Sequence, residues 1–265
     1  MFVFDGALAA TGAITGLLVG LTGVGGGAVM TPLLLLVFGV APLSAIGTDL
    51  WFAAITKLAA TRVHCGHGLI DWQVARRLWL GSLPASALAT AWLAIAPADA
   101  QTAAFLKAVV AFAVVLTAIA MLFQKALHDL GRKSRLESAG RFKSLQPSLT
   151  IAAGALLGVL VTLTSVGAGA LGVVFLAYLY PLRLTSSRLI ATDIVHAVPL
   201  AAFAGMGHLV AGNVDFALLG NLLVGALPAV IAGATLSARL PQPLLRRSLA
   251  AVLLLTGIKL LPFMS

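Results

Sequence analysis

Apolar residues in this chain come in stretches as long as a membrane-spanning helix, separated by short polar breaks. A helix that crosses the hydrocarbon core needs about 20 predominantly apolar residues. The sequence offers ten such candidate segments, at 5–22, 25–40, 44–62, 72–94, 102–123, 148–164, 167–181, 186–206, 215–236 and 243–261. This pattern predicts an all-α polytopic membrane protein with about ten transmembrane segments.

The composition supports a membrane protein and argues against several other classes. Only 9% of the residues are charged and 60% are hydrophobic, whereas an ordinary soluble domain carries about 25% charged residues. The single cysteine, Cys65, excludes an intramolecular disulfide, and no metal-ligand spacing is present. The net charge of +9 is spread over short loops, which favours a topological role over nucleic-acid binding. We therefore expect no metal and no cofactor.

The distribution of basic residues predicts the orientation. If the polar stretch 124–147 is cytoplasmic, 14 of the 17 Lys and Arg residues fall on the cytoplasmic side: Arg62, Arg76, Arg77, Lys125, Arg132, Lys133, Arg135, Arg141, Lys143, Arg183, Arg188, Arg239, Arg246 and Arg247. The opposite connections at 41–43, 95–101 and 205–214 have none. By the positive-inside rule, both termini should lie outside the cytoplasm. No basic region precedes the first apolar run, so we expect that run to remain as a span rather than to be cleaved.

The second half of the chain repeats the first. "TGVGGGAVM" at 22–30 aligns with "TSVGAGALG" at 164–172 at an offset of 142. At an offset of 144, Thr48 and Asp49 align with Thr192 and Asp193, and "GSLPA" at 81–85 aligns with "GALPA" at 225–229. The repeat divides the chain into a first five-segment unit at 1–123, a basic cytoplasmic loop at 124–147 and a second five-segment unit at 148–265. Because five is odd, two such units in one chain must be inverted with respect to each other, an architecture of secondary transporters.

Glycine-rich breaks occur at equivalent places in the two units. Only 35 residues, 6–40, are available for the first two segments, so each arm reaches about 25 Å of a hydrocarbon core about 30 Å thick. Short, glycine-interrupted segments at corresponding positions indicate a transporter binding site, because free N–H groups at helix starts favour anions. The alternative is that the glycines only permit close helix packing. The predicted substrate-binding residues are Thr22, Gly23, Gly25, Gly26, Gly27, Thr164, Ser165, Gly167, Gly169, Thr48 and Thr192.

Asp49 and Asp193 are the only acids deep within predicted spans. Intramembrane carboxylates are candidates for function, and an anion bound beside one of them would favour its protonated form. We therefore expect both, together with His196 three residues after Asp193, to couple transport to protons. The alternatives are a helix-start role for the acids and a structural role for the histidine.

Four further polar residues have simpler interpretations. Asp71 and Asp215 precede apolar segments and are interpreted as helix caps. Lys57 and Lys107 either counter the charge of a substrate anion or snorkel toward an interface, and snorkelling suits Lys107 better because it lies near the start of its segment.

Several motifs in this order resemble the sulfite exporter TauE/SafE family. They are "TGVGGGAVMTP" at 22–32, "GTDL" at 47–50, "HGLIDW" at 67–72 and "LGSLPASALAT" at 80–90, together with the partial second copy. The resemblance implies a multispanning permease of the cell inner membrane for small, often sulfur-containing anions such as sulfite or organosulfonates. The second glycine motif departs from the first, with Ala168 in place of a glycine and Val174 in place of Pro32.

The sequence thus favours a secondary transporter that moves small anions by alternating access. The alternatives are a passive anion channel of the same fold and an accessory membrane subunit or membrane enzyme. No HExxH, GxSxG or cysteine–histidine nucleophile pattern is present, which argues against an enzyme. The expected partners are a small-molecule anion and membrane lipid, with the protein a monomer or homodimer.

Overall fold

The structure is a computed structural model that describes residues 4–23, 27–64, 68–97, 99–137, 139–237 and 242–261. This described part of the chain consists of helices and short connections, without strands. The helices are α1 (Gly6–Thr22), α2 (Gly27–Leu36), α3 (Pro42–His64), α4 (Trp72–Ile95), α5 (Ala100–Leu122), α6 (Gln124–Glu137), α7 (Ala139–Thr164), α8 (Ala170–Leu179), α9 (Ser186–Val210), α10 (Phe216–Ser237) and α11 (Gln242–Leu260).

Aspartate side chains begin four of these helices. Asp5 accepts hydrogen bonds from the backbone N–H groups of Ala7 and Leu8, and Asp99 accepts one from that of Thr102. Asp71 caps α4 through the N–H of Val74 at 3.2 Å, and Asp215 caps α10 through that of Leu218 at 2.9 Å. The capping interpretation of Asp71 and Asp215 is therefore confirmed.

The two glycine-rich segments contain helices shorter than expected. In the described residues of segments 25–40 and 167–181, helix is confined to α2 and α8, which have 10 residues each. At 1.5 Å per residue, each helix is about 15 Å long, or about half the hydrocarbon core. Each short helix follows a longer one, α1 or α7, in the same half of the chain.

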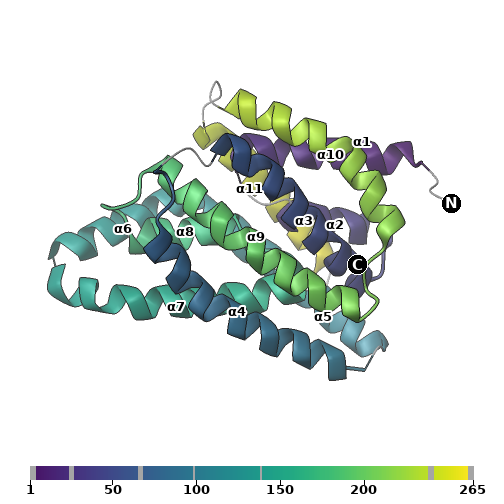
Figure 1. Ribbon diagram of the computed structural model, residues 1–265, viewed down its shortest axis with the longest axis horizontal. Coiled ribbons are helices and arrows are strands. Elements are labelled where there is room, and N and C mark those ends of the chain that lie inside the picture. Colours follow the sequence, from purple (N-terminus) through teal and green to yellow (C-terminus); the bar gives the residue numbers. More distant parts are fainter. Residues whose placement is uncertain are drawn as a thin grey trace.

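The polar stretch 124–147 also differs from expectation. We expected a loop, but α6 occupies most of it and α7 already begins at Ala139. α6 carries its basic residues on one side, and two of its three leucines, Leu127 and Leu130, on the other, an amphipathic pattern that stabilises a helix at a polar–apolar boundary. It lies at one edge of the bundle, beside α8 (Figure 1).

The most extensive helix contacts pair one helix from each half. α1 packs along α10, and α4 packs along α7 (Figure 1). A Cβ atom on Gly12 or Gly16 of α1 would lie 2.0 or 2.6 Å from a carbonyl oxygen of α10. Likewise, a Cβ atom on Gly154 or Gly158 of α7 would lie 2.3 Å from a carbonyl oxygen of α4. Because no side chain fits there, these backbones approach closely, as small residues permit in membranes.

These two interfaces use equivalent positions. Gly12 faces Leu222 and Gly154 faces Leu78, whereas Gly16 faces Ala226 and Gly158 faces Ser82. Within each comparison the α1 and α7 positions differ by 142, and the α4 and α10 positions differ by 144. The offsets of the sequence repeat therefore also relate the contacts in space.

α3 and α9 cross the middle of the bundle between the two interfaces (Figure 1). Each is tied to the opposite half by one threonine hydroxyl. Thr48 accepts a hydrogen bond from the backbone N–H of Asp215, and Thr192 accepts one from that of Asp71, both at 3.0 Å. These bonds hold the starts of α10 and α4 against the central helices, so the residues that follow Thr48 and Thr192 are fixed in place.

Five helical segments in the described residues are long and apolar enough to cross a membrane: Trp72–Ile95, Ala100–Leu122, Lys143–Thr164, Ser186–Val210 and Phe216–Ser237. Gly6–Thr22, Gly27–Leu36 and Ala170–Leu179 are apolar but shorter. The described part of the chain is thus all-helical, as expected for a membrane protein of this composition, and ten crossings remain a prediction.

Candidate functional site

The described residues that border the first glycine-rich break lie against the second break. α1 ends at Thr22 and α7 ends at Thr164, and the next residues, Gly23 and Ser165, have φ values of 66° and 59°. In the left-handed region a residue with a side chain is uncommon. A Cβ atom on Gly27 would lie 2.0 Å from the carbonyl oxygen of Ser165. The start of α2 and the second break are therefore in direct backbone contact.

Asp49 lies beside this contact, fully buried on α3. Its Oδ2 atom accepts a hydrogen bond from the hydroxyl of Thr31 on α2, and the Ser165 side chain is a second neighbour. Its other oxygen, Oδ1, has no hydrogen-bond partner among the described residues. An incompletely satisfied buried carboxylate is costly, which makes Asp49 a candidate for proton or ligand binding.

Asp193 is equally buried, on α9, and its surroundings differ from those of Asp49. Its Oδ2 lies 3.9 Å from Nζ of Lys57, too far for a hydrogen bond. Neither oxygen has a hydrogen-bond partner in the described part of the chain. A Cβ atom on Gly172 would lie 1.9 Å from Oδ1. The carboxylate thus occupies the space beside the α8 backbone that a side chain would otherwise fill.

Lys57 joins the two halves at this point. It lies on α3 and is 1% exposed. Its ammonium group donates a 2.8 Å hydrogen bond to the carbonyl oxygen of Ala168, within the second break. Burying an ammonium group costs several kcal/mol, in order of magnitude, unless it is well paired, and its ion pair with Asp193 is loose. Among the described side chains it is the one buried Lys or Arg, so snorkelling does not describe it.

His196 completes the buried polar cluster. It lies on α9, on the face that carries Asp193, and its Nε2 atom is 3.0 Å from the hydroxyl of Ser82 on α4. Its Nδ1 atom has no partner among the described residues. Lys57 is close enough to interact with it electrostatically. Lys57, Asp193 and His196 therefore form a cluster of one amine, one acid and one imidazole from both halves of the chain, and Asp49 lies eight residues before Lys57 on α3.

The four threonines predicted to bind substrate have other partners. Thr22 donates to the carbonyl oxygen of Leu18 at 2.6 Å, and Thr164 donates to that of Leu160 at 2.5 Å, each within its own helix. Thr48 and Thr192 form the ties to Asp215 and Asp71 described above. The hydroxyl that donates to Asp49 is that of Thr31 on α2.

The glycines predicted to bind substrate lie in different surroundings. Gly167 and Gly169 have φ values of 115° and 122°, and a Cβ atom on Gly167 would touch only apolar side chains. The backbone of Gly169 lies beside Asp193. A Cβ atom on Gly23 would meet Ile190 of α9 at 2.7 Å. Gly25 and Gly26 lie outside the described residues.

Sequence reasoning did not assign Thr31 or Ser82 to the site, and it left Lys57 open. Thr31 belongs to the "TGVGGGAVMTP" motif, and Lys57 lies eight residues after Asp49 in an apolar helix, so an intramembrane charge was the available signal. The partners of these residues come from distant parts of the chain, which spacing does not reveal. No group of acids, histidines or cysteines suited to a metal occurs in the described ranges.

Comparisons with known proteins agree with this picture. The family model described as "Sulfite exporter TauE/SafE" matches residues 8–260. The Bacillus subtilis (strain 168) protein described as "Probable membrane transporter protein YjnA" is 36% identical over 213 residues, which cover 78% of this chain and 80% of that protein. No solved structure matches the chain. The chain belongs to the sulfite exporter TauE/SafE family.

Proposed function

We propose that this protein is a secondary transporter of small sulfur-containing anions, of the sulfite or organosulfonate class, that works by alternating access. The family and the relative indicate a membrane transporter, and hence a small-molecule substrate and a lipid environment. The family's description as a sulfite exporter supports the substrate class.

Two inverted five-helix units would supply the alternating access. The supporting observation is that α1–α10 and α4–α7 repeat the same contacts at offsets of 142 and 144. Rocking of one repeat against the other around a central site is the usual mechanism of such folds. The central helices α3 and α9 carry the buried cluster and would lie next to that site.

The position of the Lys57 ammonium group is the observation that carries the substrate assignment. Its ammonium group sits beside the second break, and its carboxylate partner, Asp193, is 3.9 Å away rather than in hydrogen-bond contact. The start of α8 lies in the same region and adds a partial positive charge. A small oxyanion bound between the two glycine-rich breaks, as predicted, could pair with the Lys57 ammonium group at a shorter distance than the Asp193 carboxylate does.

Proton linkage follows from the same exchange. Once the anion pairs with Lys57, Asp193 has lost its positive partner and lies beside a negative charge. A buried carboxyl group in that position favours the protonated form. One proton would therefore accompany the anion, with Asp49 as a second candidate acceptor because its Oδ1 lacks a partner among the described residues.

Uptake of sulfite, a small sulfonate, sulfate and chloride into proteoliposomes tests the proposal. Lys57→Gln should weaken apparent sulfite affinity by about 30-fold or more, since truncating one partner of a buried charge pair costs about 2–5 kcal/mol. Lys107→Gln, which removes the half-buried lysine of α5, is the matched control and should transport normally. The double variant Lys57→Gln/Asp193→Asn removes both charges, so it should fold without restoring transport.

The same assay distinguishes the other functions. Saturable uptake with counterflow supports a carrier, whereas flux without counterflow would show a channel. Substrate consumption by purified protein without a gradient would show an enzyme. Normal sulfite uptake by the double variant would refute the assignment of the site to Lys57.

A further inference from the structure

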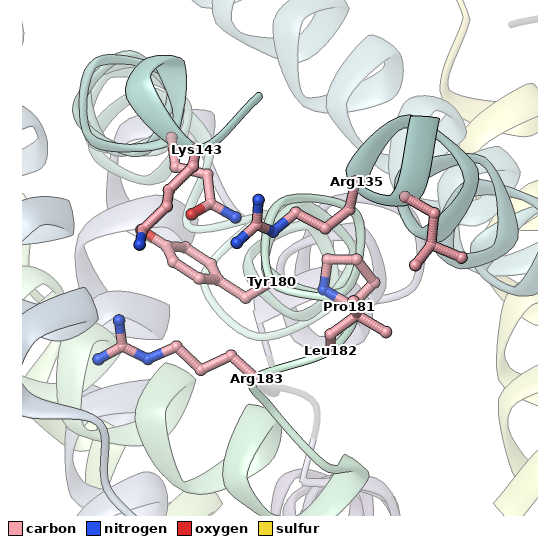
Figure 2. A pocket seen from close by; sticks show the side chains of 8 residues that line it. Arg135, Lys143, Tyr180, Pro181, Leu182 and Arg183 are labelled. Carbon is pink, nitrogen blue, oxygen red and sulfur yellow. The ribbon is translucent and has the colours of Figure 1, made fainter. Parts of the chain in front are cut away.

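A basic pocket opens between α6, α7 and the segment that follows α8, away from the central cluster. It has a volume of about 470 Å³, and its lining includes Arg135, Lys143, Gln146, Tyr180 and Arg183. Lys143 and Arg135 approach from opposite sides above the Tyr180 ring, and Arg183 lies below it (Figure 2). The volume lies in the range of sites for small ligands, about 300–1,000 Å³.

The floor of the pocket is rigid. Tyr180 is 1% exposed, and its hydroxyl lies 2.8 Å from that of Thr150 and accepts a 3.1 Å hydrogen bond from Arg77. Gln146 donates to the carbonyl oxygen of Leu179 at 2.6 Å. Because these partners fix Tyr180 and Gln146, the cations above them face a preformed surface.

Three of the residues that line the pocket, Arg135, Lys143 and Arg183, are cationic. Asp71 accepts two hydrogen bonds from Arg183, at 2.6 and 2.9 Å, and it lies 3.9 Å from Arg188. The single Asp71 carboxylate therefore interacts with two arginines. Arg135 and Lys143 add two more positive charges to the lining, which makes the site complementary to an anion.

Exposed leucines adjoin these cations. Leu136 and Leu182 line the same pocket and are 65% and 58% exposed. Leu130 on α6 and Leu145 on α7 are also exposed. Apolar surface of this kind is unfavourable in water, and an amphipathic basic helix such as α6 suits the membrane interface. A ligand that covers both kinds of surface must itself be amphipathic.

We propose that this pocket binds the phosphate-containing headgroup of an acidic phospholipid, with the lipid's apolar part against Leu136 and Leu182. The phosphate lies between Arg135 and Lys143, and Tyr180 and Gln146 form the floor beneath it. Basic pockets between membrane helices are known to favour acidic headgroups. A free phosphate ion shares the headgroup chemistry but leaves the two leucines exposed, so the structure favours the lipid.

Native mass spectrometry of the full-length protein in detergent tests this site, with phosphatidylglycerol and phosphatidylcholine of identical chains as probes. The wild type should retain one phosphatidylglycerol in preference to phosphatidylcholine. Arg135→Gln/Lys143→Gln should weaken phosphatidylglycerol binding by about 25-fold, at about fivefold per cation. Lys125→Gln/Arg132→Gln removes the same charge from α6 outside the lining and should change binding by less than about twofold.

Two further measurements separate the lipid from a free anion. Leu136→Ser/Leu182→Ser keeps every charge and should also weaken phosphatidylglycerol binding, whereas millimolar inorganic phosphate or glycerol 1-phosphate should not displace the lipid. Displacement by inorganic phosphate, or full binding by the leucine variant, would show a free-anion site and overturn the proposal. Equal losses in the two charge variants would show unspecific surface attraction and overturn it as well. If the double charge variant does not fold, Lys143→Gln, at an exposed position, should give the fivefold loss alone.

Discussion

Gly27→Ala perturbs the contact between the two glycine-rich breaks with a single methyl group. Gly27 is the first residue of α2, and its φ is not positive, so alanine suits its backbone conformation. In a helix without crowding, alanine is more stable than glycine by about 1 kcal/mol. The sign of the effect therefore depends on what the new methyl group meets.

The structure makes that contact unfavourable. The Cβ atom would lie 2.0 Å from the carbonyl oxygen of Ser165 and 2.9 Å from its hydroxyl oxygen. Ordinary contact requires about 3.4 Å or more, so the two backbones must separate by about 1.4 Å, because a backbone carbonyl cannot rotate away as a side chain can. Overpacking of this kind costs about 1–3 kcal/mol. After the helix gain is subtracted from the upper figure, we expect a net loss of about 2 kcal/mol.

Two assays on purified Gly27→Ala measure the consequence. The midpoint of thermal unfolding should fall by about 4–8 °C, on the scale of about 2–4 °C per kcal/mol for a chain of this size. Sulfite flux should fall by about tenfold or more, because a displacement of about 1 Å at a binding site is costly. Gly6→Ala is the matched control, since its Cβ atom would meet only the Phe4 ring, at 4.0 Å. A Gly27→Ala protein that is more stable than the wild type and transports normally would refute the packing of the two breaks.

Two predictions concern coupling and orientation. Asp49→Asn should fold, because an amide oxygen can still accept the hydrogen bond from Thr31. Both Asp49→Asn and Asp193→Asn should lose the response of sulfite flux to an imposed pH gradient. An unchanged response in both variants would show that these acids are structural. Arg132→Cys, in a chain whose Cys65 is replaced by serine, should react with an impermeant thiol reagent only from the cytoplasmic side, and labelling only from outside would reverse the predicted topology.

Much of the scaffold was predictable because its determinants are local. Glycines spaced by four residues in α1 and α7 mark one face of each helix, and the repeat offsets relate those faces. The apolar segments and the aspartate caps are also properties of short stretches of sequence. The helix in the polar stretch 124–147 was missed because the stretch was interpreted as a loop from its polarity alone.

The partners within the buried cluster were not predictable in the same way. Thr48 and Thr192 follow the repeat and make equivalent bonds, so symmetry could have related them once one was known. Thr31, however, has an apolar residue at its equivalent position under the offset of 142, Val173, and Lys57 has one under 144, Ala201. These residues have no polar counterpart in the other half. Their contacts depend on how far helices from different halves are shifted along their axes relative to one another.

This asymmetry bears on the proposed transport cycle. The first half supplies the amine and the second supplies the carbonyl of Ala168 and the carboxylate of Asp193, so Lys57 links the two units that alternating access would move. A rocking motion that separates α3 from the second break must give up the 2.8 Å hydrogen bond. Losing a hydrogen bond to a charged group costs about 1.5–3 kcal/mol. An anion that binds Lys57 between the breaks would offset that loss, so an occupied carrier would exchange between its two states more readily than an empty one. Counterflow faster than net efflux is the kinetic consequence, and equal rates would show that Lys57 does not restrain the empty protein.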